Sequence, residues 1–259
     1  MPRASRYHLP GHIWHITHRC HRRQFLLKFA RDRRAWVRWL FEARKRYGLC
    51  VLDYAVTANH IHLLARDQGR GEIARSMQLI AGRSGQAHQR RKNRKGAFWE
   101  DRYHATAVDS DHYLARCLVY IDLNMVRAGV VGHPGEWETG GYHEIQAERA
   151  RCRIVDRGAL ANVLGLESAD ELAAAHAGWI EAALATGVGR REPGWSESVA
   201  VGRREFVERM AAELGTRALY RQVEEAGDAH VLRESGEPYR GTSEGKNEAL
   251  GSKMDSPGR

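Results

Sequence analysis

Two histidines one residue apart, in the stretch TANHIHLLAR at residues 57–66, are the first side chains in this sequence that could do chemistry. Alternate residues of a β-strand point to the same face, so His60 and His62 would project side by side while Ile61 and Leu63 face the core. Two neutral imidazoles suit a divalent ion, but two ligands alone hold an ion poorly, so a third ligand is expected. The alternative is that this short pattern occurs by chance.

The stretch CLVYIDLN at residues 117–124 offers both a third ligand and a nucleophile. Tyr120 and Asn124 are four residues apart and share one face of a predicted helix. An amide oxygen is an acceptable ligand for Mg²⁺ or Mn²⁺. If this helix packs across the sheet at the histidine strand, His60, His62 and Asn124 form a three-ligand site with Tyr120 beside it. Otherwise, Tyr120 is an ordinary helix tyrosine packed against the sheet.

Such a set of side chains predicts chemistry on a phosphodiester. A metal ion there acts as a Lewis acid and neutralises developing charge. A free tyrosine has a pKa near 10, so the phenol needs a nearby cation to become a phenolate. Attack of the phenolate on phosphorus would form a phosphotyrosine and release a 3′ hydroxyl. Because another 3′ hydroxyl can reverse that bond, the set favours cutting and rejoining DNA over degrading it.

Hydrophobic periodicity predicts the elements that must position these groups. Their order is strand, helix, strand, strand, helix, strand, helix. This order is typical of an α+β fold with a ferredoxin-like split βαβ core, an antiparallel sheet and flanking helices. Strands are predicted over 11–20, 49–57, 60–66 and 100–108, and helices over 32–48, 71–91 and 109–129.

The sequence changes character near residue 145. Residues 1–145 hold 25 Lys/Arg against 13 Asp/Glu, a net charge of +12, whereas residues 146–259 have a net charge of −3. A concentrated positive field favours a polyanionic partner. We therefore expect a functional domain over 1–145, a helical accessory region over 146–230, and a polar, disordered tail over 231–259.

Basic clusters in the first domain predict where DNA would bind, because basic side chains bind phosphates. The alternative is a solvated charged loop. Phe98 and Trp99 beside the second cluster could stack on bases, but a place in the core is favoured. The residues expected to contact DNA are Arg22, Arg23, Arg90, Arg91, Lys92, Arg94, Lys95 and Arg127.

Composition argues against a membrane protein. No run approaches the roughly 20 apolar residues of a membrane span, and the first residues carry no apolar signal segment. The four cysteines are far apart, so neither a thiolate metal site nor a disulfide framework is expected. Reduced thiols and a cytoplasmic location are the expectation.

Three ordered motifs, ANHIHLLA, GAFWEDRYHATAV and YLARCLVYIDLNMVRAGVV, resemble those of the single-tyrosine HUH transposases, the IS200-like type. The most similar branch is the REP-associated tyrosine transposases of bacteria, and the resemblance covers about residues 3–145. It implies a ferredoxin-like HUH nuclease core, a divalent metal, and cleavage of single-stranded or hairpin DNA through a covalent 5′-phosphotyrosine. Residue by residue, it implies His60, His62 and Asn124 as metal ligands and Tyr120 as the nucleophile.

The sequence departs from the family pattern at two places. Thr57-Ala58 stand where the family usually has Met-Pro, and Met125 stands where proline usually follows the helix asparagine, here Asn124. Proline cannot sit deep inside a helix, so its absence is expected to let the helix run on and to change how Arg127 is presented. Neither departure removes a catalytic group.

Two other functions stay open at this point. One is a DNA-binding regulator with an idle or domesticated site. The other is a metal-dependent hydrolase of small phosphodiesters that uses only the histidine pair. Replacing Tyr120 separates the three, because only strand transfer needs the phenol. The oligomeric state is left as monomer or homodimer.

Overall fold

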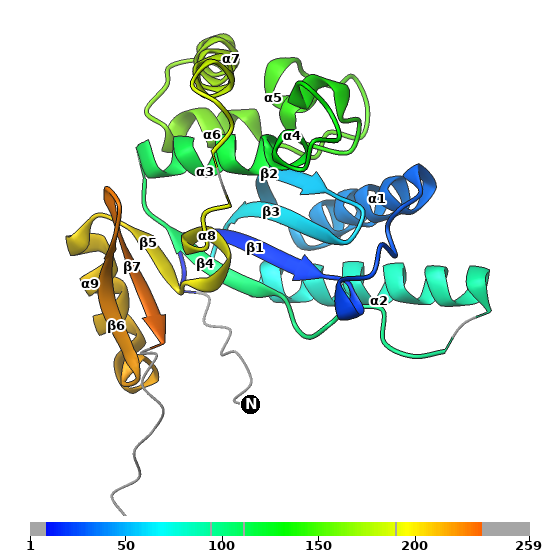
Figure 1. The fold of residues 1–259 in the computed structure, drawn as a ribbon, viewed down its shortest axis with the longest axis horizontal. Helices are drawn as coiled ribbons and strands as arrows, with labels where there is room; N and C mark the ends of the chain where they lie inside the picture. The colour runs from blue at the N-terminus through cyan, green and yellow to red at the C-terminus, as the bar shows by residue number, and fades with distance from the viewer. Residues whose placement is uncertain (1–8, 94, 111, 190, 235–259) are drawn as a thin grey trace, which may run out of the picture.

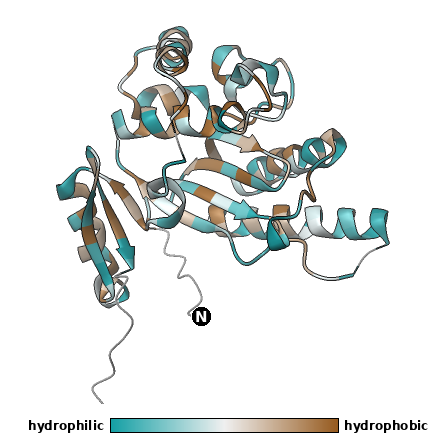
Figure 2. Cartoon of the chain, in the orientation of Figure 1, coloured by the Kyte–Doolittle hydropathy of each residue, from teal (hydrophilic) through white to brown (hydrophobic). Residues whose placement is uncertain are grey.

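The computed structural model describes residues 9–93, 95–110, 112–189 and 191–234 of the chain. Figure 1 shows one twisted sheet with α1 and α2 on one side and α3 on the other. In Figure 2 the central strands carry hydrophobic residues, whereas α2 is largely hydrophilic along its exposed side. Among the described residues, none of the helices combines the length and the apolar character needed to cross a bilayer.

The first part of the chain forms a ferredoxin-like unit. The strands lie in the order β2-β3-β1-β4, and every neighbouring pair among these four is antiparallel. The predicted α+β class, split βαβ order and flanking helices are therefore confirmed. The elements are β1 (Ile13–Arg19), α1 (Ala30–Tyr47), β2 (Cys50–Val56), β3 (His60–Arg66), α2 (Glu72–Lys92) and β4 (His104–Val108).

Local sequence explains how β3 is held in place. Gly48 ends α1 with a φ of +69°, a conformation that glycine adopts without strain, and its N–H donates to the carbonyl of Arg44. The chain then enters β2, which is buried along its whole length, and turns into β3. Ile61 and Leu63 are fully buried in the core, so the alternate side chains His60 and His62 face the opposite side.

The predicted helix over 109–129 is interrupted. α3 spans His112–Asp122 and α4 spans Asn124–Arg127, and Leu123 between them has φ −76° and ψ 6°. The helix therefore does not run on, although no proline is present. The guanidinium of Arg127 donates to the carbonyl oxygen of Tyr120. In an unbroken helix that oxygen would accept from the N–H of Asn124, so the side chain takes over a backbone position.

The expected helical region 146–230 holds helices, as predicted, but also strands that were not predicted. Pairing of β5 with β4 is parallel, and β7 and β6 follow as antiparallel neighbours, so within the described residues the sheet has seven strands. The elements of this part are α5 (Tyr142–Gln146), α6 (Arg157–Val163), α7 (Ala169–Ala185), α8 (Gly194–Glu197), β5 (Ala200–Gly202), α9 (Arg204–Leu214), β6 (Arg221–Ala226) and β7 (Ala229–Glu234).

A purely helical description of residues 146–230 is therefore wrong for the last part of that range. β5 is only three residues long and exists through its pairing with β4 and β7, which no local pattern signals. The hairpin of β6 and β7 did have a signal, because Gly227-Asp228 between two short runs is typical of a tight hairpin turn. Gly227 has the positive φ, +69°, that such a turn requires.

The predicted tail over 231–259 starts too early. Residues 231–234 belong to β7, where Val231 and Leu232 are buried. The remainder, 235–259, lies outside the described residues. The domain boundary at residue 145 stays a prediction, although the sheet itself continues from β4 into β5 across it.

Candidate active site

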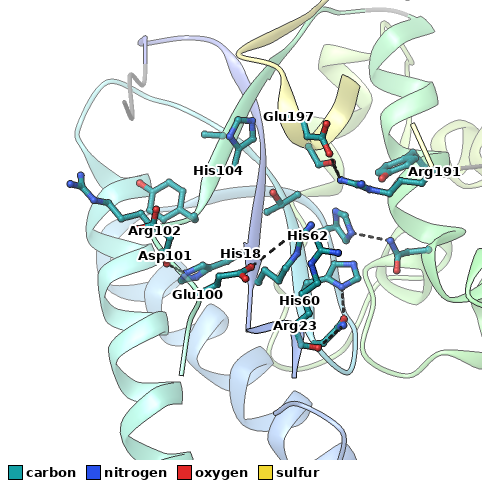
Figure 3. Close-up of a pocket in the computed structure, with 18 of the residues that line it drawn as sticks. His18, Arg23, His60, His62, Glu100, Asp101, Arg102, His104, Arg191 and Glu197 are labelled. Carbon is teal, nitrogen blue, oxygen red and sulfur yellow. Dashed lines mark hydrogen bonds and ion pairs between the residues drawn. The ribbon is translucent and has the colours of Figure 1, made fainter. Parts of the chain in front are cut away.

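β3, α3 and α4 bring the predicted residues together in one chain. His60, His62, Tyr120 and Asn124 line one cleft, whose volume is about 860 Å³. The ring centroids of His60 and His62 are 4.9 Å apart, and the ring of Tyr120 lies 5.9 Å from that of His62. Figure 3 shows the two imidazoles side by side, with Arg191 and Glu197 approaching from the C-terminal part of the chain.

The turn before β3 fixes the ring of His60. Its Nδ1 lies 2.7 Å from Oδ1 of Asn59 and 3.0 Å from Oγ1 of Thr57. The Thr57 hydroxyl donates to the backbone carbonyl of His60 at 2.8 Å, so it can only accept from the ring. Nδ1 of His60 therefore carries the proton, and Nε2 is left with a lone pair. Thr57, one of the departures from the family pattern, thus has a defined place in the site.

His62 lies deeper in the site. Its Nε2 is 3.0 Å from the amide nitrogen of Asn124, and its Nδ1 is 2.8 Å from Nε2 of His15. Two imidazole nitrogens and one carboxamide are a donor set that suits Mg²⁺ or Mn²⁺, so these residues fit a divalent ion. For Asn124 to join the ligands, its amide must turn so that the oxygen, not the nitrogen, faces the ion.

Burial keeps the imidazoles neutral. It lowers the pKa of His60 to about 4 and that of His15 to about 3, and it also lowers the pKa of His62 well below the usual value. Nearby arginines also lower the pKa of both His60 and His62, and the imidazoles of His60 and His15 further lower that of His62. At neutral pH both rings on β3 are therefore uncharged, which is the form that can bind a metal.

Tyr120 is 5% exposed, and its ring lies under the guanidinium of Arg127, whose Cζ is 4.2 Å from the ring centroid. Burial raises the pKa of the Tyr120 phenol, while Arg127 and Arg191 oppose that rise. The phenol is thus protonated at neutral pH in this state, and it needs an additional positive charge in the cleft to ionise. The indole of Trp195 packs near the same ring, at 6.3 Å between centroids.

The structure separates the residues predicted to bind DNA into groups. Arg23 and Arg127 line the cleft, and Arg22 is exposed on the short helical turn beside it. Arg127 is not free in this state, because it stacks on Tyr120 and donates to its carbonyl oxygen.

The cluster at the end of α2 lies away from the residues that line the cleft. Arg91 makes a two-pronged ion pair with the buried Asp32 of α1, with 2.9 Å between Nη2 and Oδ2, so it joins two helices. Lys92 lies over the ring of Phe29, with Nζ 5.4 Å from the centroid. The remaining members are Arg90 and Lys95, which are exposed, and Arg94, which lies outside the described residues.

Sequence reasoning missed several positive side chains of the cleft. Five further arginines line it, and three of them come from the C-terminal part, whose net charge is negative. Those three reach the cleft only because the C-terminal part of the chain returns to the sheet, so no local sequence signal could have predicted their place. The five are Arg19, Arg102, Arg191, Arg221 and Arg233. Phe98 is buried and Trp99 stacks on His18 at 4.0 Å, as the core interpretation of these aromatics predicts.

Comparison with known proteins gives a matching family and a similar solved structure. Residues 9–124 match the family described as "Transposase IS200 like", and this confirms the family predicted from the sequence motifs. No curated protein matches the chain. A solved structure described as "Structure of the REP associates tyrosine transposase bound to a REP hairpin" is 18% identical, with a TM-score of 0.48. The similarity covers 66% of this chain and 90% of that one.

Proposed function

We propose that this chain acts on single-stranded DNA near hairpins. The premise is that residues 9–124 form an IS200-like transposase domain, which cuts and rejoins DNA. Cleavage would proceed through a covalent 5′-phosphotyrosine on Tyr120, with a divalent metal held by His60, His62 and Asn124. One observation carries the proposal. The phenol and the three candidate ligands meet in one cleft, and all four come from the same chain.

In the cleavage step, Tyr120 would be the nucleophile, and the metal and Arg127 would stabilise negative charge. The Tyr120 oxygen attacks the scissile phosphorus and forms the new P–O bond, while the bond from phosphorus to the 3′ oxygen breaks. The phenolic proton passes to water, and the leaving 3′ oxygen takes up a proton. The bound metal would supply the positive charge that polarises the phosphate and favours the phenolate. Arg127 stabilises the same negative charge, since its guanidinium already lies over the ring.

Rejoining is the reverse reaction with a different strand. A second 3′ hydroxyl attacks the phosphotyrosine, loses its proton and forms a new P–O bond, while the Tyr120 oxygen leaves with the electron pair of the broken bond and takes up a proton. The cleft suits this exchange because Tyr120 is buried against Trp195 and His62, so the intermediate is held in place. Arginines around the opening, Arg19 and Arg23 among them, would bind the DNA backbone.

A covalent-adduct assay tests the proposal. The chain is incubated with single-stranded hairpin oligonucleotides and Mn²⁺, and a protein–DNA adduct is sought on a denaturing gel. The adduct is expected with the wild-type chain, and it should vanish with EDTA or with Tyr120→Phe. Tyr113→Phe is the matched control, because Tyr113 lies on the same helix but its hydroxyl donates to the carbonyl of Asp228, at 3.0 Å.

The two alternative functions predict different results, the first in this assay and the second in an assay of small-phosphodiester hydrolysis. A DNA-binding regulator with an idle site would retain the hairpin but form no adduct. A hydrolase of small phosphodiesters would keep its activity when Tyr120 is replaced by phenylalanine. Either result would refute the strand-transfer function.

A further inference from the structure

We propose that His15 is a positioning residue that fixes the protonation pattern of His62, so that Nε2 of His62 keeps its lone pair for the metal. The inference rests on the proposed function. His15 lies on β1, the strand next to β3, and is fully buried. It lines no part of the cleft and would not touch the ion itself.

The first link is a backbone carbonyl. Nδ1 of His15 lies 2.7 Å from the carbonyl oxygen of Trp195 in α8. A carbonyl oxygen can only accept, so Nδ1 of His15 must carry a proton. A second proton on Nε2 would place a full charge on a buried ring whose partners here are a carbonyl and another imidazole. Burial strongly disfavours that state, so Nε2 of His15 is unprotonated.

The second link is the contact between the two imidazoles. Nε2 of His15 lies 2.8 Å from Nδ1 of His62, and the two rings are nearly parallel, at 7°. Because Nε2 of His15 can only accept, Nδ1 of His62 must donate. Nε2 of His62 is then left with its lone pair, and the amide N–H of Asn124 at 3.0 Å donates to it. Each donor in this series of three hydrogen bonds therefore faces an acceptor.

The opposite pattern would block the site. A proton on Nε2 of His62 would point at the amide nitrogen of Asn124 and would occupy the position that a metal needs. Metal-binding histidines commonly donate their second N–H to a carboxylate or carbonyl, which fixes the tautomer. Here His15 lies between His62 and the carbonyl, so the carbonyl fixes the tautomer of His62 indirectly. That carbonyl belongs to Trp195 in α8, in the C-terminal part of the chain. His60 differs, because its partners Thr57 and Asn59 are local.

The inference predicts two measurements on the full chain. In metal-free protein labelled with ¹⁵N-histidine, long-range proton–nitrogen spectra should show Nδ1 of His62 protonated and Nε2 bare. In Mn²⁺ titrations, His15→Leu should weaken binding by about 10- to 100-fold, the usual effect of removing such a partner. His15→Gln keeps an oxygen that can accept from His62, so its Mn²⁺ affinity should stay within about threefold of wild type.

Thr106→Val is the matched control. Thr106 is the β4 neighbour of His15, and its hydroxyl donates to the carbonyl of Ser198 at 2.6 Å. The variant removes a buried bond to the same C-terminal segment without touching either imidazole, so Mn²⁺ affinity should be unchanged. If Thr106→Val weakens Mn²⁺ binding as much as His15→Leu, docking of the segment explains the effect and the inference is overturned.

The spectra keep the inference testable even if His15→Leu does not fold. A wild-type His62 with its proton on Nε2 would overturn it outright, and so would equal Mn²⁺ affinities for the Leu and Gln variants and wild type. Failure of the wild-type chain to bind Mn²⁺ would instead refute the metal-dependent function. The proton–nitrogen spectra of the metal-free chain measure the tautomer of His62 independently of Mn²⁺ binding, so the two failures can be told apart.

Discussion

Replacing Asp109 by alanine should loosen the C-terminal strands from β4, the strand with which β5 pairs. Asp109 follows β4 and is almost fully buried. Its carboxylate accepts from the backbone N–H of Arg203 at 3.1 Å, from the guanidinium of Arg203 at 2.8 and 3.1 Å, and from the N–H of Ser110 at 2.9 Å. Burial alone would raise the pKa of Asp109, but these bonds outweigh it and hold the pKa below its usual value.

The expected cost follows from what alanine leaves behind. Removing one partner of a buried, hydrogen-bonded charge pair costs about 3–5 kcal/mol. The Arg203 side chain is 52% exposed, so water can solvate its guanidinium once the carboxylate is gone. The backbone N–H groups of Arg203 and Ser110 would lose their acceptor when the carboxylate is removed. We therefore take the lower end, and expect the free energy of unfolding to fall by about 3 kcal/mol.

Urea unfolding at pH 7.5, followed by tryptophan fluorescence, measures this loss. Glu148→Ala is the control, because it breaks the ion pair of Glu148 and Arg153, whose side chains are both 55% exposed. Such a pair is worth under about 1 kcal/mol. The reasoning is wrong if Asp109→Ala costs no more than this control.

Acid gives a second check on the same variant. The pKa of Asp109 is lowered in the folded chain, so its contribution is present above its ordinary pKa of 3.8 and is lost as the pH falls through the lower, folded value. The stability difference between wild type and Asp109→Ala should therefore shrink below about pH 4. A difference that stays constant into that range would show that the charge of Asp109 does not cause the effect.

Three further predictions concern the site and its surroundings. In EDTA, the free energy of unfolding of wild type should fall by about 2 kcal/mol more than that of His15→Gln between pH 7.5 and 5. The reason is that burial lowers the pKa of His15 from 6.5 to about 3, so the unfolded chain takes up the proton first. Denaturant unfolding at both pH values measures this difference, and an equal change in both proteins refutes the prediction. Arg127→Gln should slow adduct formation about tenfold, since the stacked guanidinium stabilises the Tyr120 phenolate, and a rate unchanged in single-turnover assays contradicts this. If Arg90 and Lys95 bind DNA, replacing both by Gln should reduce the slope of log affinity against log salt by about 1–2, whereas an unchanged slope removes them from the interface.

The sequence by itself determined the ferredoxin-like order of elements and the chemistry of the β3 face. Alternation along HIHLL predicts which side chains face the core, because a strand has a fixed period of two. The four-residue spacing predicts that Tyr120 and Asn124 share a helix face. Even so, the break at Leu123 was not predictable from this pattern, since it accompanies a side-chain bond from Arg127 to a backbone carbonyl.

Tertiary structure alone decided what surrounds those groups. β5 is three residues long and forms only because β4 and β7 offer it backbone partners. Trp195 lies 180 residues from His15 in the chain, yet its carbonyl fixes that ring, and Arg191 reaches the cleft from the same segment. Local periodicity records which face of an element is apolar, but it does not record which distant backbone oxygen a buried imidazole will meet. That pairing is set when the whole sheet assembles.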